Sequence, residues 1–238
     1  MSAANGVKNI LDVASSVPVV LLASAVAWAL LTRRPPAAPD PRAQRIERLD
    51  GQRIDAERIS HVIGNGDIVI VEFSDFECPF CGQYARETLP TVKRDLVESG
   101  MVRYVVLHYP LETIHPHALK ASEAVECADR QGHFWEMRER LFSNQAALAP
   151  VELIRHAEAL GLDSKRFDQC VNGGEAVQRV RADVAEGRRL GVLGTPSFFI
   201  GTIRADGGID LVKRMQGAVP ADLLASEVRE ARALPIKH

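Results

Sequence analysis

The chain has 238 residues, of which 46% are hydrophobic, and a formal net charge of -2. This composition is ordinary for a folded protein with a hydrophobic core, and the length allows one large domain or one domain with an insertion. The weak negative charge argues against a nucleic-acid partner, and four cysteines in so long a chain exclude a small disulfide-held scaffold.

The N-terminal region differs from the rest of the chain. Residues 13–32 form 20 consecutive positions without a charge, which is long enough to cross a bilayer. Lys8 before this run and the small residues 25–27 within it are typical of a cleaved signal peptide. Apolar residues continue almost to Arg33, which favours an uncleaved transmembrane signal anchor over residues 1–34. A helix that packs on the folded domain is the third interpretation.

Charges around this segment leave its orientation in conflict. Four arginines follow it, Arg33, Arg34, Arg42 and Arg45, whereas only Lys8 and the amino terminus precede it. The positive-inside rule alone would put the large domain in the cytoplasm, against an exported protein. Residues 35–45 form a proline-rich linker, which is either a semi-rigid spacer of about 20 Å or disordered.

The first strong strand signal after the linker is a β-branched run at residues 68–71. A run of this kind without turn residues is typical of a strand that is covered on both faces. Before it, residues 42–67 are polar and mixed, and only residues 46–49 suggest an edge strand. The run therefore predicts a central strand.

A Cys-X-X-Cys motif follows this strand at Cys78 and Cys81. Pro79 suits the first turn of a helix, because the N–H group that it lacks would be unpaired there. Positions three apart on a helix lie about 60° apart around its axis, so the two sulfurs can meet. The partial positive charge at the helix N-terminus favours the Cys78 thiolate. The motif therefore predicts redox chemistry.

Zinc binding is the main rival interpretation of the motif. A structural zinc site needs four ligands, usually including a second closely spaced pair. The remaining cysteines, Cys127 and Cys170, lie 43 positions apart, so the sequence offers no second pair. We therefore expect neither a metal nor a cofactor, and inert structural thiols are the remaining alternative.

The elements after the motif alternate between helix and strand. A helix is expected from Cys81 to residue 99, kinked near Glu87 by Pro90 and ended by Gly100. The strand pattern of residues 101–108 then completes a right-handed parallel βαβ unit.

A helical block follows, because apolar residues recur at three- and four-residue spacing. Its five helices are expected at residues 118–130, 134–144, 150–160, 163–171 and 175–190. Strands at residues 197–200 and 209–212 form a hairpin, and a helix over residues 220–233 closes the chain. The order is βαβ, a helical insertion, then ββα.

Several segments together resemble one known family. They are residues 72–81, the proline-kinked helix, Gly194-Thr195-Pro196, His115-Pro116, Glu126-Cys127-Ala128 and residues 131–136. With the helical insertion, they resemble the DsbA-like thiol-disulfide oxidoreductases of the thioredoxin superfamily over residues 46–238. The resemblance implies an α/β thioredoxin fold whose two parts, residues 46–113 and 191–238, flank an inserted helical domain at residues 114–190.

The resemblance also implies roles for individual residues. Cys78 is the sulfur that attacks and is attacked, and Cys81 resolves the mixed disulfide. The Thr195–Pro196 peptide is expected to be cis, beside the sulfurs, where its backbone can pair with an extended substrate. Glu72 is expected to be a buried acid with a raised pKa that accepts the Cys81 proton. The alternative interpretation is that the Glu72 carboxylate pairs with a lysine or faces water.

The remaining cysteines, aromatic residues, histidines and arginines that stand out in the sequence are expected to have structural roles. Some proteins of this family contain a second, non-catalytic disulfide in the helical insertion, so we expect one between Cys127 and Cys170, and two buried free thiols are the alternative. We expect Phe134 and Trp135 in the helical core, and solvated or capping roles for His108, His115 and His117. Four arginines were interpreted as solvated helix faces: Arg138, Arg140, Arg188 and Arg189.

The leading hypothesis is a membrane-anchored thiol-disulfide oxidase of the bacterial cell envelope that faces the extracytoplasmic side. If the N-terminal segment is cleaved, the protein is periplasmic or secreted. Its expected partners are reduced or misfolded exported polypeptides and a membrane redox partner, either a quinone-linked oxidase or an electron donor. Because Pro79-Phe80 lacks a histidine, an intermediate redox potential is expected. A reductase or isomerase of the same fold and a non-enzymatic tethered binding or chaperone module are the rivals.

Overall fold

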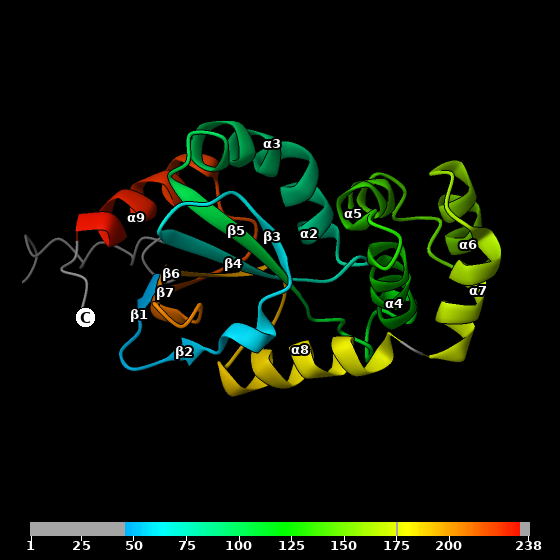
Figure 1. Ribbon diagram of the computed structural model, residues 1–238. Coiled ribbons are helices and arrows are strands. Elements are labelled where there is room, and N and C mark those ends of the chain that lie inside the picture. The colour runs from blue at the N-terminus through cyan, green and yellow to red at the C-terminus, as the bar shows by residue number, and fades with distance from the viewer. Residues whose placement is uncertain (1–45, 175, 234–238) are drawn as a thin grey trace, which may run out of the picture. The chain divides into compact units, whose positions relative to one another are not determined.

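A seven-stranded mixed sheet lies at the centre of the residues that this computed structural model describes, 46–174 and 176–233 (Figure 1). The strand order is β1-β7-β6-β4-β5-β3, and β2 also pairs with β7. Strands β4 and β5 are parallel, and the other pairs are antiparallel. This topology confirms the βαβ unit and the later hairpin. The strands are β1 Ile46–Arg48, β2 Arg53–Ile54, β3 His61–Ile63, β4 Ile68–Ser74, β5 Val102–His108, β6 Ser197–Ile203 and β7 Ile209–Gln216.

Helices cover both faces of the sheet, so all seven residues of β4 are buried. One face packs its core residues, such as Ile70 and Phe198, against α2, α3 and α9, and the other packs Val71 and Phe199 against α8. Figure 1 shows α4 to α7 gathered beyond the end of the sheet from which α2 begins. The α-helices are α2 Pro79–Gln83, α3 Leu89–Val92, α4 Ala118–Asp129, α5 Phe134–Ser143, α6 Pro150–Ala159, α7 Ser164–Gly173, α8 Val177–Arg189 and α9 Ala221–Ala233. We call α4 to α8 the helical insertion.

The helix after the cysteines contains two π-helical turns, η3 (Tyr84–Thr88) after α2 and η4 (Lys93–Val97) after α3. The turn η3 ends just before Pro90, which has no N–H group to donate to the preceding turn. The helix therefore changes its hydrogen-bond register next to the proline, where the sequence predicts a kink. It ends at Val97 rather than residue 99, and Gly100 at φ 74° follows as its stop.

The sequence prediction missed β2, β3 and the short 3₁₀ helix η2 (Ala56–Arg58). Strands of two and three residues are too short to show an alternating pattern, and their pairing depends on distant partners. None of the helices within residues 46–174 and 176–233 is long and apolar enough to span a bilayer. The predicted signal anchor or signal peptide, residues 1–34, and the linker, residues 35–45, lie outside the described residues.

Candidate active site

The two cysteines of the motif lie where β4 leads into α2. Cys78 is the N-cap residue of α2, its backbone is extended, and Pro79 opens the helix. The exposed fraction is 3% for Cys78 and 0% for Cys81, so only the first sulfur retains any contact with solvent. Both side chains are free thiols in this structure. A thiol at the start of a helix, with a second thiol one turn on, has the geometry of a redox pair.

The surroundings of the two thiols drive their pKa values apart. A hydrogen bond with the Cys81 side chain, helped by the Thr195 side chain and the N–H groups of Cys81 and Phe80, lowers the pKa of Cys78 from 9.0 to about 6, although burial opposes this shift. Burial raises the pKa of Cys81 well above 9.0, and the negative charges of Cys78 and Glu72 act in the same direction. At neutral pH the pair therefore holds one thiolate, on Cys78.

The loop before β6 lies against Cys78. The Thr195–Pro196 peptide bond is cis, and the Cys78 thiol donates a hydrogen bond to the Thr195 carbonyl oxygen at 3.3 Å. The structure thus brings two predicted site residues, Thr195 and Pro196, close to Cys78, which lies 117 positions before Thr195 in the chain.

Glu72 is fully buried in β4, and its carboxylate accepts hydrogen bonds from three side chains. Its Oε1 accepts a hydrogen bond from the Ser74 hydroxyl at 2.7 Å. Its Oε2 accepts one from the Tyr104 hydroxyl and one from Arg138 Nη2, both at 2.6 Å. The carboxylate is therefore buried, as the main expectation has it, and it is also paired, with an arginine where the alternative interpretation named a lysine.

The position of Arg138 corrects the sequence interpretation. We predicted a solvated helix face, but only 2% of Arg138 is exposed. The residue lies on α5 between Met137 and Leu141, one turn after Phe134, and all three of these are buried. Position 138 thus falls on the apolar face of the helix. The sequence contained a signal for this burial, because Arg138 occupies a position where the helical spacing of apolar residues predicts a buried side chain.

A second buried carboxylate at the site belongs to Asp75, a residue that the sequence interpretation missed. Its Oδ1 accepts a hydrogen bond from the Glu77 N–H group, and its Oδ2 contacts the Leu111 N–H group and His115 Nδ1, each at 2.8 Å. His115, for which the sequence predicts a solvated or capping role, is therefore held by Asp75. This carboxylate fixes both the turn before Cys78 and the loop after β5.

Gln145, in the loop after α5, is a further residue that the sequence did not reveal. Its side-chain amide donates hydrogen bonds of 2.8 Å to the carbonyl oxygens of Phe76 and Cys78. Gly82 faces this amide, and a Cβ atom at that position would lie 1.9 Å from Gln145 Oε1. The helical insertion therefore reaches the cysteine segment through Gln145 as well as Arg138.

A comparison with protein families decides the membership of the chain. Residues 57–218, which are more than half of the sequence, match the family described as Thioredoxin. The chain belongs to the thioredoxin family.

Solved structures resemble this thioredoxin-family protein over most of the described chain. A thioredoxin-like oxidoreductase from Silicibacter pomeroyi DSS-3 shares 26% identity at a TM-score of 0.60, over 74% of this chain and 93% of that one. BdbD from Bacillus subtilis shares the fold at a TM-score of 0.65 and 16% identity, over 78% of this chain and 98% of that one. Together with the family match, these structures show that the chain has a thioredoxin-like fold around the two thiols.

The curated relatives of this thioredoxin-family chain are much longer proteins. A Na⁺/H⁺ antiporter NhaA 3 from Salinispora tropica is 38% identical over 178 residues, which are 74% of this chain but 26% of the antiporter. The chain thus spans about a quarter of the length of that relative. The antiporter contains a related segment, and its transport activity is not carried over to this chain.

The thioredoxin-family chain also contains a disulfide outside the active site. It joins Cys127 of α4 to Cys170 of α7, with a Cα–Cα distance of 5.8 Å. The bridge therefore ties together two helices of the insertion.

A buried cluster of His61, His108 and Glu126 presents three groups of the kind that bind metals. Both histidine Nε2 atoms contact the same oxygen, Glu126 Oε1, at 2.6 and 2.8 Å. Ligand atoms around a tetrahedral zinc ion with bonds of about 2.0 Å would be about 3.3 Å apart, so these contacts are hydrogen bonds instead. Burial opposes the charge of Glu126, but the two histidines hold its pKa below the ordinary value. The cluster links β3, β5 and α4.

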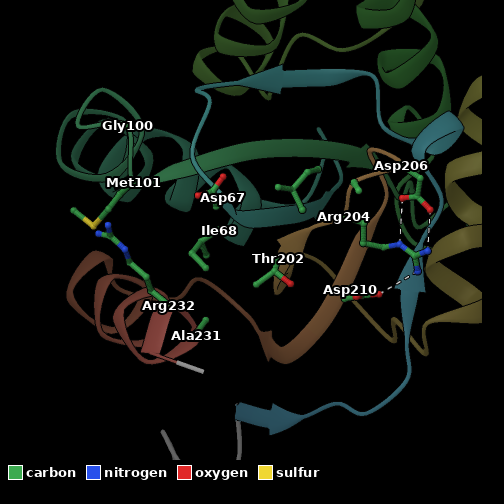
Figure 2. A pocket seen from close by; sticks show the side chains of 12 residues that line it. Asp67, Ile68, Gly100, Met101, Thr202, Arg204, Asp206, Asp210, Ala231 and Arg232 are labelled. Carbon is green, nitrogen blue, oxygen red and sulfur yellow. Dashed lines mark hydrogen bonds and ion pairs between the residues drawn. The ribbon is translucent and has the colours of Figure 1, made fainter. Parts of the chain in front are cut away.

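One cavity among the described residues lies away from the cysteines (Figure 2). Its volume is about 920 Å³, and it is lined by the start of β4, the end of β6 and the end of α9. Arg204 in this cavity already pairs with Asp206 and Asp210. Because β4 leads from this cavity toward Cys78, the two lie at opposite ends of the strand, and we do not include the cavity in the site.

Proposed function

We propose that the protein donates its Cys78–Cys81 disulfide to reduced or misfolded exported polypeptides. The observation that carries this proposal is the pKa of about 6 at Cys78. A stabilised thiolate stabilises the reduced form, which makes the disulfide more oxidising. The lowered pKa of Cys78 therefore supports disulfide donation, and the intermediate potential stays a prediction.

In the proposed reaction a substrate thiolate attacks Cys78 of the enzyme disulfide. The bond between the two enzyme sulfurs breaks, and its electron pair goes to Cys81, which takes up a proton because its pKa is high. A second substrate thiolate then attacks the substrate sulfur of the mixed disulfide and releases the Cys78 thiolate. The substrate loses two electrons as its disulfide forms, and the enzyme gains them as two cysteines.

Glu72 is proposed as the group that exchanges the proton with Cys81. Two observations support this role: the carboxylate is completely buried, and its charge acts on the pKa of Cys81. If Glu72 has this role, Glu72→Gln should slow the step in which Cys81 changes its protonation state.

An extended polypeptide is the proposed substrate, bound beside the loop that contains Thr195 and Pro196. The close approach of this loop to Cys78 supports backbone pairing at this place. Three large apolar side chains are also exposed: Phe80 of the motif by 60%, Leu193 before the loop by 83% and Ile114 after β5 by 68%. They lie on three segments that meet the site and would contact apolar residues of an unfolded chain.

The proposed location is the bacterial cell envelope on its extracytoplasmic side, where a quinone-linked membrane oxidase would reoxidise Cys78 and Cys81. The Cys127–Cys170 disulfide supports an oxidising compartment. A reductase or isomerase would use the same site with an electron donor as its partner.

The redox potential measured against glutathione separates these alternatives. We expect a value well above that of thioredoxin, which is about -270 mV. A value near that of thioredoxin would favour the reductase. In parallel, the oxidised protein should restore disulfides to a reduced, unfolded protein, and Cys78→Ser should abolish this activity. Unchanged activity in that variant would remove the thiols from the function.

A further inference from the structure

The helical insertion supplies a cation to the redox site. Arg138 of α5 donates to Glu72 Oε2 at 2.6 Å, and the two side chains are 3% and 0% exposed. The guanidinium carbon lies 4.9 Å from the centre of the Phe142 ring and 5.9 Å from that of Trp135, which hold it from the insertion side. Because both side chains are almost fully buried, solvent screens their pairing only weakly.

Arg138 is the one cation among the hydrogen-bond partners that the structure gives to Glu72. The remaining two, Ser74 and Tyr104, are neutral hydroxyl groups. The negative charge of Glu72 raises the pKa of Cys81, whose neighbouring Cys78 thiolate acts in the same direction. The positive charge of Arg138 next to Glu72 offsets the negative charge of this carboxylate and so opposes its effect on Cys81. The difficulty of forming a thiolate at Cys81 therefore depends on a residue outside the thioredoxin-like sheet.

We propose that Arg138 is a positioning residue of the redox site, which holds Glu72 and offsets its charge so that Cys81 can react as a thiolate. This inference rests on the proposed function, since it assigns Cys81 the resolving role. The same thiolate is the leaving group when the disulfide is attacked and the nucleophile when the disulfide forms. Arg138 therefore acts on the rate in both directions. At neutral pH Cys81 of the reduced protein is a neutral thiol, so the equilibrium with glutathione changes little.

The test is a pair of rate measurements on the full chain with Arg138→Met. The rate of disulfide reduction by glutathione and the rate of reoxidation by oxidised glutathione should both fall about threefold for each unit that the Cys81 pKa rises. The fall is smaller than tenfold because each unit of pKa lowers the thiolate fraction of Cys81 tenfold, but the more basic thiolate is also a stronger nucleophile. Their ratio, the equilibrium constant, should stay within about twofold of the wild-type value.

Three further variants separate this role from a structural one. Arg138→Lys keeps a positive charge and should restore most of both rates. Arg140→Met makes the same substitution two residues along α5, where the arginine contacts His156 of the insertion, and should leave both rates unchanged. In a Glu72→Gln background, Arg138→Met should cause no further slowing, because Arg138 acts through Glu72.

Each outcome has one meaning. Equal exchange rates for Arg138→Met and the wild type would overturn the proposal. The proposal would also be overturned if Arg138→Met slowed both rates by the same factor in the wild-type and Glu72→Gln backgrounds. If Arg138→Met does not fold, Arg138→Gln, which removes the charge but keeps a hydrogen-bond donor, takes its place, and rates equal to those of the wild type would again overturn the proposal. Failure of the wild-type protein to exchange with glutathione would instead contradict the proposed function itself.

Discussion

Two thiols only three positions apart ionise differently because one of them stabilises the other. The Cys81 side chain is the largest cause of the lowered pKa of Cys78, and burial is the largest cause of the raised pKa of Cys81. Replacing Cys81 by Ala therefore removes the main stabilising contact from the Cys78 thiolate. We expect the pKa of Cys78 in this variant to rise above 6. The measurement is the pH dependence of alkylation, and a midpoint that stays near 6 would contradict this origin of the shift.

Gly82 shows how closely the insertion contacts the motif. A Cβ atom at this position would lie 1.9 Å from Gln145 Oε1, so Gly82→Ala should displace the amide from the carbonyl groups of Phe76 and Cys78. Loss of two hydrogen bonds should lower the free energy of unfolding by about 1–3 kcal/mol, measured in urea. Gly194→Ala is the control, since a Cβ atom there meets nothing within 4 Å. Equal effects of the two substitutions would count against the contact.

The helices of the insertion are held together by a covalent link as well as by their packing. The Cys127–Cys170 disulfide spans 43 positions between α4 and α7. On the chain-entropy model, a loop of this length contributes about 4 kcal/mol. The double substitution of both cysteines by Ala should lower the free energy of unfolding by up to this amount, while the exchange rate at Cys78 stays the same. A loss of exchange in the folded variant would show that the bridge also supports the active site.

The sequence predicted most of the elements because their patterns are local. The buried run of β4, the periodicity of the insertion and the turn at Gly100 each depend on neighbouring residues. Strands β2 and β3 lacked such a pattern, and the π-helical turns depend on how the chain accommodates Pro90. The two strands depend on distant pairing partners, and the π-helical turns depend on local hydrogen-bond geometry.

The site was only partly predictable for a related physical reason. Cys78, Cys81 and Thr195-Pro196 occur in recognisable short motifs. The contacts of Arg138 and Gln145 to the site cross 66 and 67 positions of sequence, respectively, and no short motif records them. Arg138 was misjudged because charged residues on helices are usually solvated. Its place on the apolar face of α5 was the contrary signal.

For the whole molecule, the shifted thiol links redox state to stability. In the reduced protein the pKa of Cys78 is about 6, below its ordinary value of 9.0. Between these pH values the unfolded chain binds more protons, so the free energy of unfolding rises with pH and this gain is lost as pH falls through 6. The disulfide form has no such group.

The resulting prediction concerns the difference between the two redox forms. The stability of the reduced protein relative to the oxidised one should increase from pH 6 to pH 8.5, measured by urea unfolding of both forms. Reduced Cys78→Ala should lose this pH dependence. A difference that is constant with pH, or that decreases, would mean that the Cys78 thiolate is not stabilised by the fold.

The most direct test of the central claim is capture of the mixed disulfide. Cys81→Ala should retain a reduced substrate peptide, added with oxidised glutathione, in a covalent bond to Cys78, because the resolving sulfur is missing. Mass spectrometry of the intact adduct and of its fragments identifies the sulfur involved. We predict an adduct at Cys78 in Cys81→Ala and no adduct in Cys78→Ala. An adduct at Cys81 in Cys78→Ala, at a comparable rate, would contradict it.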